Sequence, residues 1–358
     1  MLKRIDIYII KKFLGTYFFA IALILAIAVV FDFNEKMDSF IRNEAPVRAI
    51  IVDYYFNFIP YFANLFSPLF VFIAVIFFTS QLADNSEVIA MLASGMSFKR
   101  LMRPYMISAA IIAIVTFALN SFIIPPSNVV RIAFQNKYVK NKEMTYARNS
   151  QLMVEPGVIA YMERFDNTIK TGYRFSLEKF DDKKLVSRLT AKQVKYDSAY
   201  RWEIKDYMIR NFDGMVETIE KGAKLDTIIR IEPTDILVSR YDSEIMNTPT
   251  LKRYIDRQKQ RGVANIKDFE IEYHKRFAAV AAAFILTAIG MSLSSRKVKG
   301  GMGLNIGLGL ALSFSYILFM TVSSTFAVTG KTSAFIAVWI PNFVYTLIAI
   351  YLYRKAPK

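Results

Sequence analysis

The 358-residue sequence contains no cysteine and a single histidine, His274. The absence of cysteine excludes disulfide bonds, thiolate nucleophiles and cysteine-bound metals. One histidine cannot form a histidine cluster. Because no candidate nucleophile stands out near His274, we interpret it as a residue at the edge of an apolar segment rather than as a catalytic base.

A complete phosphate-binding loop is also missing. The segment 329–333, TGKTS, carries the Gly-Lys-Thr ending of such a loop, but the pattern requires glycine five residues before Gly330, where Thr325 stands. The glycine-rich segment 300–309 is apolar, and Gly303 and Gly307 have the spacing that allows two membrane helices to approach closely. We therefore expect no cofactor bound by this chain and no ATP hydrolysis by this loop.

Long apolar runs dominate what is present. The sequence is 54% hydrophobic and 21% charged, which predicts a membrane bundle combined with a water-exposed domain. Six stretches without charged residues are long enough to span a bilayer: 13–31, 54–83, 104–130, 277–295, 300–330 and 332–353. Pro125 and Pro126 predict that the third helix ends near Ile124. The first run is too long for a cleavable signal peptide.

Basic residues give the net charge of +16, and they cluster beside the apolar runs. This distribution is typical of cytoplasmic loops and argues against nucleic-acid binding. With six spans, the clusters all fall on one side of the membrane: Lys3, Arg4, Lys11 and Lys12; Lys99, Arg100 and Arg103; Arg296, Lys297 and Lys299; Arg354, Lys355 and Lys358. We predict cytoplasmic termini and, in a bacterium, an inner-membrane protein whose large central segment is periplasmic.

That central segment has the two-residue period of half-buried strands. Seven short runs alternate between polar and apolar residues over 151–231, and turn dipeptides such as Asp213-Gly214 and Lys221-Gly222 separate them. A helix is expected over 251–262, and a second from Ile266 into the fourth span. The predicted fold is an α-helical bundle of six transmembrane helices with an inserted all-β, jelly-roll-like periplasmic domain. Its parts are residues 1–126, 127–247 and 248–358.

Between the second and third spans, residues 84–101 predict a short amphipathic helix. Asp84, Asn85 and Ser86 are helix-capping residues, and Glu87 suits the first turn, where the helix dipole favours negative charge. Gly95 is a plausible end. The centre of the segment consists of small residues, which favours docking into a protein groove over lying in lipid.

Just outside the first span, Lys36 lies near Glu35 and Asp38. Two interpretations stay open. Lys36 is either an interfacial anchor of the first helix or a contact for an anionic lipid headgroup.

Residues 86–101, SEVIAMLASGMSFKRL, resemble the corresponding segment of the LptF/LptG permeases of lipopolysaccharide export. Segment 231–237, IEPTDIL, and segment 251–262, LKRYIDRQKQRG, resemble the same family before its fourth span. The resemblance covers essentially the whole chain, with a slight preference for the LptG type.

The resemblance implies one permease subunit of an ABC transporter. Its partners would be a cytoplasmic LptB-like ATPase dimer that uses the ATP, a second LptF- or LptG-like permease, periplasmic jelly-roll proteins of the LptC and LptA kind, and lipopolysaccharide. It also implies a coupling helix that docks on the ATPase, formed here by Glu87, Ser86, Ala90, Met91, Ala93, Ser94 and Gly95. From their position, we expect the substrate cavity to include Lys36, Phe31, Ile27, Leu308, Leu312 and Phe319. The alternative is a membrane-anchored envelope enzyme or scaffold with a periplasmic β domain.

Overall fold

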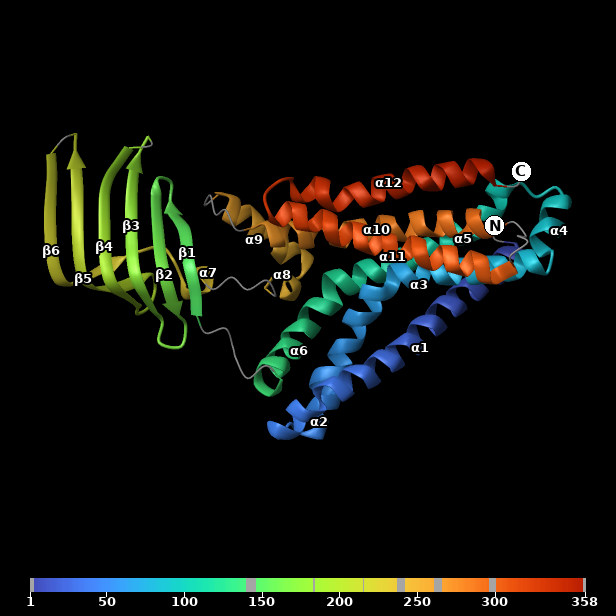
Figure 1. Ribbon diagram of the computed structural model, residues 1–358, viewed down its shortest axis with the longest axis horizontal. Helices are drawn as coiled ribbons and strands as arrows, with labels where there is room; N and C mark the ends of the chain where they lie inside the picture. The colour runs from blue at the N-terminus through green and yellow to red at the C-terminus, as the bar shows by residue number, and fades with distance from the viewer. Residues whose placement is uncertain are drawn as a thin grey trace. The chain divides into compact units, whose positions relative to one another are not determined.

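The computed structural model describes residues 3–139, 146–182, 184–214, 216–236, 242–260, 266–295 and 301–356. They form two compact units (Figure 1). The first unit comprises Met1–Val139, Glu244–Leu251 and Lys267–Lys358, and the second comprises Lys140–Ser243 and Lys252–Ile266. Four predicted features lie outside the described residues: the basic residues at 296–299, Lys358, the end of the 231–237 motif and the end of the helix predicted over 251–262.

The first unit is a helical bundle. Within the described residues, six helical segments are long and apolar enough to cross a membrane, which confirms the predicted number. Its elements are α1 (Arg4–Arg42), α2 (Val47–Ala49), η1 (Ile50–Tyr55), α3 (Phe56–Asp84), α4 (Glu87–Ala93), α5 (Phe98–Ala118), η2 (Leu119–Ile123), α6 (Ile124–Tyr138), α10 (Lys267–Ser294), α11 (Gly301–Val328) and α12 (Ala334–Lys355). Along the chain, α8 (Asp242–Ile245) and α9 (Thr248–Gln260) precede α10.

The prediction that the third helix ends near Ile124 is wrong. The chain continues as the π-helical turn η2 and then as α6, so one helical segment runs from Phe98 to Tyr138. Pro125 and Pro126 occupy the start of α6. A proline removes the backbone N–H that an α-helix would use, and the wider π turn before it re-routes the hydrogen bonds instead of ending the helix.

Helix α3 lies at the centre of the bundle, and two glycines allow its neighbours to approach it. A Cβ atom on Gly290 of α10 would lie 2.9 Å from Val75 Cγ1, and one on Gly309 of α11 would lie 2.2 Å from Ile76 Cδ1. Both α3 residues are fully buried. Gly303 and Gly307 have no atom within 4 Å of such a Cβ. The expectation of close packing at that pair is therefore wrong within the described part of this chain, where Gly309 makes the close approach instead.

We predict that Gly290→Val and Gly309→Val destabilise the bundle by about 1–3 kcal/mol each, because the added methyl groups overlap buried side chains of α3. The measurement is unfolding of the purified protein in detergent micelles. Gly307→Val is the matched control on α11, and its stability should stay close to that of the parent. Equal losses at positions 307 and 309 would contradict the packing described.

The second unit is an antiparallel β domain, as predicted. Six strands were found within the described residues: β1 (Tyr146–Glu155), β2 (Val158–Asp166), β3 (Thr171–Asp181), β4 (Lys184–Tyr196), β5 (Arg201–Asp213) and β6 (Val216–Ile228). They form one sheet in sequence order. The last two of the seven expected strands are a single strand, because Gly222 pairs with Tyr207 within the ladder and Lys221-Gly222 makes no turn. Within the described residues consecutive strands are neighbours, so the connectivity is that of a meander, an order that the sequence did not predict.

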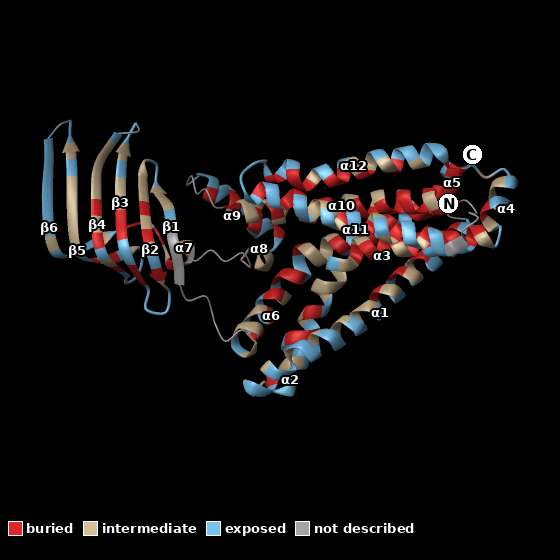
Figure 2. Cartoon of the chain, in the orientation of Figure 1, coloured by how far each residue is buried: buried red, intermediate tan, exposed pale blue. Residues whose placement is uncertain are grey.

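The core of the β domain lies on one face of the sheet and is covered by the chain that follows β6. Trp202 is 1% exposed, and its indole N–H donates to the carbonyl oxygens of Ile229 and Ile231 at 3.2 and 3.1 Å. Both isoleucines are buried in the same cluster, together with Ile236 of α7 (Pro233–Ile236). The other face and strand β6 are largely exposed (Figure 2).

Ion pairs tie β6 to β5 on the exposed surface. Glu203 of β5 accepts bonds from Lys224 of β6, at 2.8 Å, and from Lys205, at 3.1 Å. The Lys224 ammonium, followed by that of Lys205, lowers the pKa of the Glu203 carboxyl. The lowered pKa means that these bonds favour the folded domain at neutral pH and are lost as the pH falls through the carboxyl range.

Candidate functional site

Helix α4 and its flanking residues form a small surface at the end of the bundle that also carries both chain termini (Figure 1). Of the seven helical residues, only Val88 is buried, and it joins the bundle core. Ser86 and Gly95, both with positive φ, mark the two ends of this helix. The helix is therefore shorter than residues 84–101: Asp84 ends α3, and Phe98 begins α5.

The predicted coupling residues divide into two groups. The exposed ones are Ser86, Ala90, Ala93, Ser94 and Gly95. Met91 packs against the bundle core, and Glu87 is half-exposed, with its Oε1 accepting a bond from Asn85 Nδ2 at 3.3 Å. A surface of small side chains lets another protein approach the helix backbone closely. Ile89, which the sequence did not single out, is 55% exposed on the same helix and adds an apolar contact.

A polar cluster joins α1 to η1 and contains Lys36. Its ammonium forms an ion pair with Asp32 and donates to the Tyr54 hydroxyl at 2.6 Å. Tyr54 and Tyr55 donate to the two carboxylate oxygens of Asp32 at 3.2 and 3.3 Å. The π-helical turn η1 contains both tyrosines. Lys36 is thus held within its own chain. The partner, Asp32, has the i,i+4 spacing that could have identified it from the sequence.

We predict that Asp32→Asn and Lys36→Gln each destabilise the outer part of α1, and that a double-mutant cycle gives a coupling free energy of about 1–3 kcal/mol. The reason is that both side chains are mostly buried, with 11% and 17% exposure. Unfolding in detergent micelles provides the measurement. Glu35→Gln, an exposed carboxylate next to Lys36 in sequence, serves as the control, and its coupling with Lys36→Gln should be close to zero.

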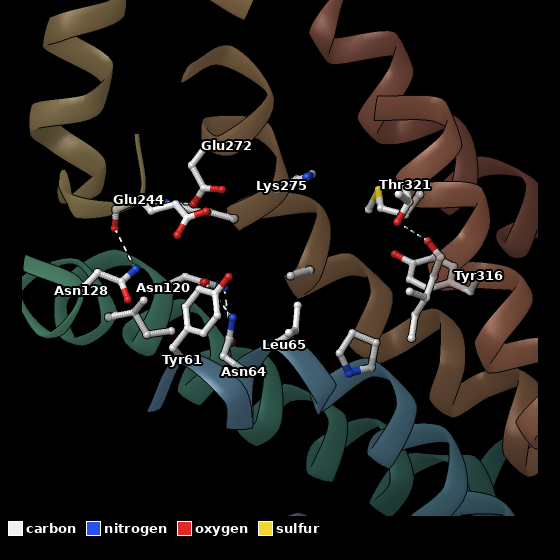
Figure 3. Close-up of a pocket in the computed structure, with 16 residues that line it drawn as sticks. Tyr61, Asn64, Leu65, Asn120, Asn128, Glu244, Glu272, Lys275, Tyr316 and Thr321 are labelled. Carbon is white, nitrogen blue, oxygen red and sulfur yellow. Dashed lines mark hydrogen bonds and ion pairs between the residues drawn. The ribbon is translucent and has the colours of Figure 1, made fainter. Parts of the chain in front are cut away.

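A cavity of about 290 Å³ lies within the first unit, between α3, η2, α6, α10 and α11 (Figure 3). Its walls combine polar and apolar side chains. The polar ones include Asn64 and Asn120, whose amide groups bond to each other at 2.8 Å, and Glu244, Glu272 and Lys275. The apolar part includes Leu65, Pro68, Ala279 and Ile317. Such a lining can hold a small polar group attached to an apolar one.

Two buried arginines are associated with this cavity: Arg276 lines it, and Arg131 contacts Tyr61, which lines it. Arg276 is 2% exposed and donates to Glu272 Oε1 and Thr248 Oγ1, both at 3.0 Å. Thr248 in turn donates to Ser121 of η2 at 3.0 Å. Arg131 lies over the ring of Tyr61, 4.4 Å from its centre. Sequence analysis did not assign these residues a role. The available signal was a cation beside an apolar run, since charged residues in spans are rare and mark polar networks.

The expected cavity residues lie on α1 and α11, but only some of their side chains are exposed on the surface of the chain. Ile27, Phe31 and Leu308 are exposed, at 42%, 71% and 45%. Leu312 and Phe319 pack against the bundle core. The exposed face of α11 instead continues from Leu308 through Leu318, Val322 and Phe326. These faces need an apolar environment, which a bilayer or another membrane chain supplies.

Six apolar helical segments and a β domain inserted after the third define a multi-pass membrane protein. The sequence matches the lipopolysaccharide export system permease LptF/LptG family over residues 7–355. Because the match covers nearly the whole chain, this protein belongs to that family of transport permeases. A search of curated proteins found no match.

Proposed function

We propose that this chain is one permease subunit of an ATP-driven transporter that extracts lipopolysaccharide from the bacterial inner membrane. In this proposal the lipid passes along the periplasmic β domain towards the outer membrane. Membership of the LptF/LptG family carries the proposal. The six spans and the inserted β domain are the architecture that such a role requires.

The proposed orientation places both termini and α4 in the cytoplasm. The basic residues near these elements support it, since cytoplasmic loops are enriched in lysine and arginine. The chain lacks a complete phosphate-binding loop, so the energy would come from a separate ATPase. The surface of α4, with exposed Ala90 and Ala93 and half-exposed Glu87, is the proposed ATPase docking site.

The proposed lipid-binding surface is formed by the exposed faces of α1 and α11. Phe31 and Leu308 lie on these faces. Each acyl methylene that passes from the bilayer into water costs about 0.8 kcal/mol. A lipid with several acyl chains is therefore costly to extract, which is why an external energy source is needed. A second permease subunit would complete the cavity, and periplasmic jelly-roll proteins would receive the lipid.

We predict that Glu87→Ala weakens binding of the ATPase by roughly 10-fold or more, because it removes a charge-assisted contact of about 1.5–3 kcal/mol. The measurement is the amount of ATPase that co-purifies with the full-length permease. Glu44→Ala is the matched control, an exposed glutamate in the turn between α1 and α2. Undiminished co-purification and lipid export in Glu87→Ala would exclude the docking role of this carboxylate.

We also predict that a photoreactive amino acid at position 31 or 308 crosslinks to lipopolysaccharide several-fold more than one at position 343. All three positions are exposed and apolar, but Phe343 lies on α12, outside the proposed surface. The measurement is the yield of adduct in native membranes. Equal yields at the three positions would indicate general lipid exposure instead of a substrate surface.

A further inference from the structure

An ion pair connects the first turn of α1 to the first turn of α5. The Arg100 guanidinium donates two hydrogen bonds to the Asp6 carboxylate, Nη1 to Oδ1 and Nη2 to Oδ2, each 2.7 Å long. Asp6 is 2% exposed, and the Arg100 side chain is 23% exposed. Two parallel bonds fix the orientation of the groups as well as their separation, which a single bond does not.

Both partners are held in place at the helix ends. The Asp6 carboxylate also accepts the backbone N–H of Lys3 at 2.8 Å, which caps α1. The backbone N–H of Arg100 donates to the Ser97 hydroxyl at 3.3 Å, which caps α5. The positive charge of an arginine in the first turn of a helix interacts unfavourably with the helix dipole, and the buried Asp6 carboxylate offsets this interaction. The pair therefore joins two helix ends rather than two flexible side chains.

The pair lies next to α4 along the chain. Helix α4 ends at Ala93 and α5 begins at Phe98, so only the segment Ser94–Ser97 separates them. Val88 of α4, Phe98 of α5 and Ile9 of α1 belong to one buried cluster. Farther along the same helices, the rings of Phe13 and Tyr105 are 6.0 Å apart. A displacement of α4 would therefore reach α5 through the short segment Ser94–Ser97, and α1 through Arg100.

Helix α1 is attached to the bundle near its beginning and again near its C-terminal end, where Lys36 and Asp32 bond to Tyr54. Its buried residues are Asp6, Ile9, Phe13, Tyr17 and Ile21, followed only by Phe40 near its C-terminal end. The exposed face with Ile27 and Phe31 lies between these attachments. At 1.5 Å per residue, Phe31 is about 38 Å along the helix axis from Asp6. A shift of Asp6 would therefore tilt α1 about its attachments at Asp32 and Phe40.

We propose that Arg100 and Asp6 are positioning residues that transmit movement of α4 to α1, so that ATPase action changes the tilt of the lipid-facing part of α1. This inference rests on the proposed function, because it assumes an ATPase bound at α4. A purely structural role would lower stability without changing how far α1 moves when nucleotide binds.

The test compares the assembled transporter containing the parent permease with those containing Arg100→Gln and Asp6→Asn. We expect both variants to bind the ATPase normally and to hydrolyse ATP within about twofold of the parent. The amount of lipopolysaccharide exported per ATP should fall about 10-fold, which corresponds to about 1.4 kcal/mol of lost coupling. The exchanged pair Asp6→Arg with Arg100→Asp should recover part of that ratio. Lys99→Gln, an exposed neighbour in the same turn, is the control and should leave the ratio unchanged.

A distance measurement separates transmission from stability. Spin labels at the exposed positions 19 of α1 and 343 of α12 should change their separation when the transporter is trapped with nucleotide. In Arg100→Gln this change should be lost. A normal distance change together with a normal export ratio in Arg100→Gln would overturn the proposal. If that variant does not accumulate, Arg100→Lys, which keeps the charge but not the two parallel bonds, takes its place, and an unchanged ratio overturns the proposal equally.

Failure of the proposed function itself gives a different result. In that case the parent protein would neither co-purify with an ATPase nor export lipopolysaccharide, whatever residue occupies position 100.

Discussion

Close packing around α3 is the constraint on which the helical unit depends. In a bilayer, apolar side chains gain little from leaving lipid for one another, so helix association relies on tight fit and on polar bonds between helices. Val75 and Ile76 of α3 are covered by α10 and α11 at Gly290 and Gly309. Helices from the first half of the chain and from the second half thus meet at two consecutive residues, although the β domain separates them in sequence.

Hydrogen bonds and ion pairs between polar side chains determine which helical segments are neighbours, which apolar packing alone does not. Arg276, Thr248 and Ser121 connect α10, the start of α9 and η2, which lie on either side of the β domain in sequence. Each group would be costly in hydrocarbon without a partner, so the network strongly favours one arrangement of these segments. The ion pair of Asp32 and Lys36 has a comparable effect on α1 and η1. Lys36, which the sequence left open as an interfacial anchor or a headgroup contact, bonds within its own chain and is part of the structure that holds α1.

The proposed transport cycle uses different parts of the same bundle. Helix α4 offers a narrow exposed surface while only Val88 anchors it in the core. The ion pair of Asp6 and Arg100 links the next helix to the beginning of α1, and α1 presents its apolar face farther along. In the proposed cycle, movement passes from the exposed surface of α4 to the apolar face of α1 through directed bonds.

The sequence by itself determined the six spans, the inserted β domain and the position of α4, because uncharged runs, two-residue alternation and the turn residues around 84–97 are local signals.

It did not determine the continuation of the helix past Pro125, since the π turn before it depends on how η2 packs. It did not locate the close approach at Gly309, because the spacing of Gly303 and Gly307 looks equally suitable without knowledge of which face meets α3. The separation of exposed Phe31 from packed Phe319, and the pairing of Asp6 with Arg100 across 94 residues, were likewise decided by tertiary structure. Contacts between residues distant in sequence leave no periodic pattern, and so only the folded chain reveals them.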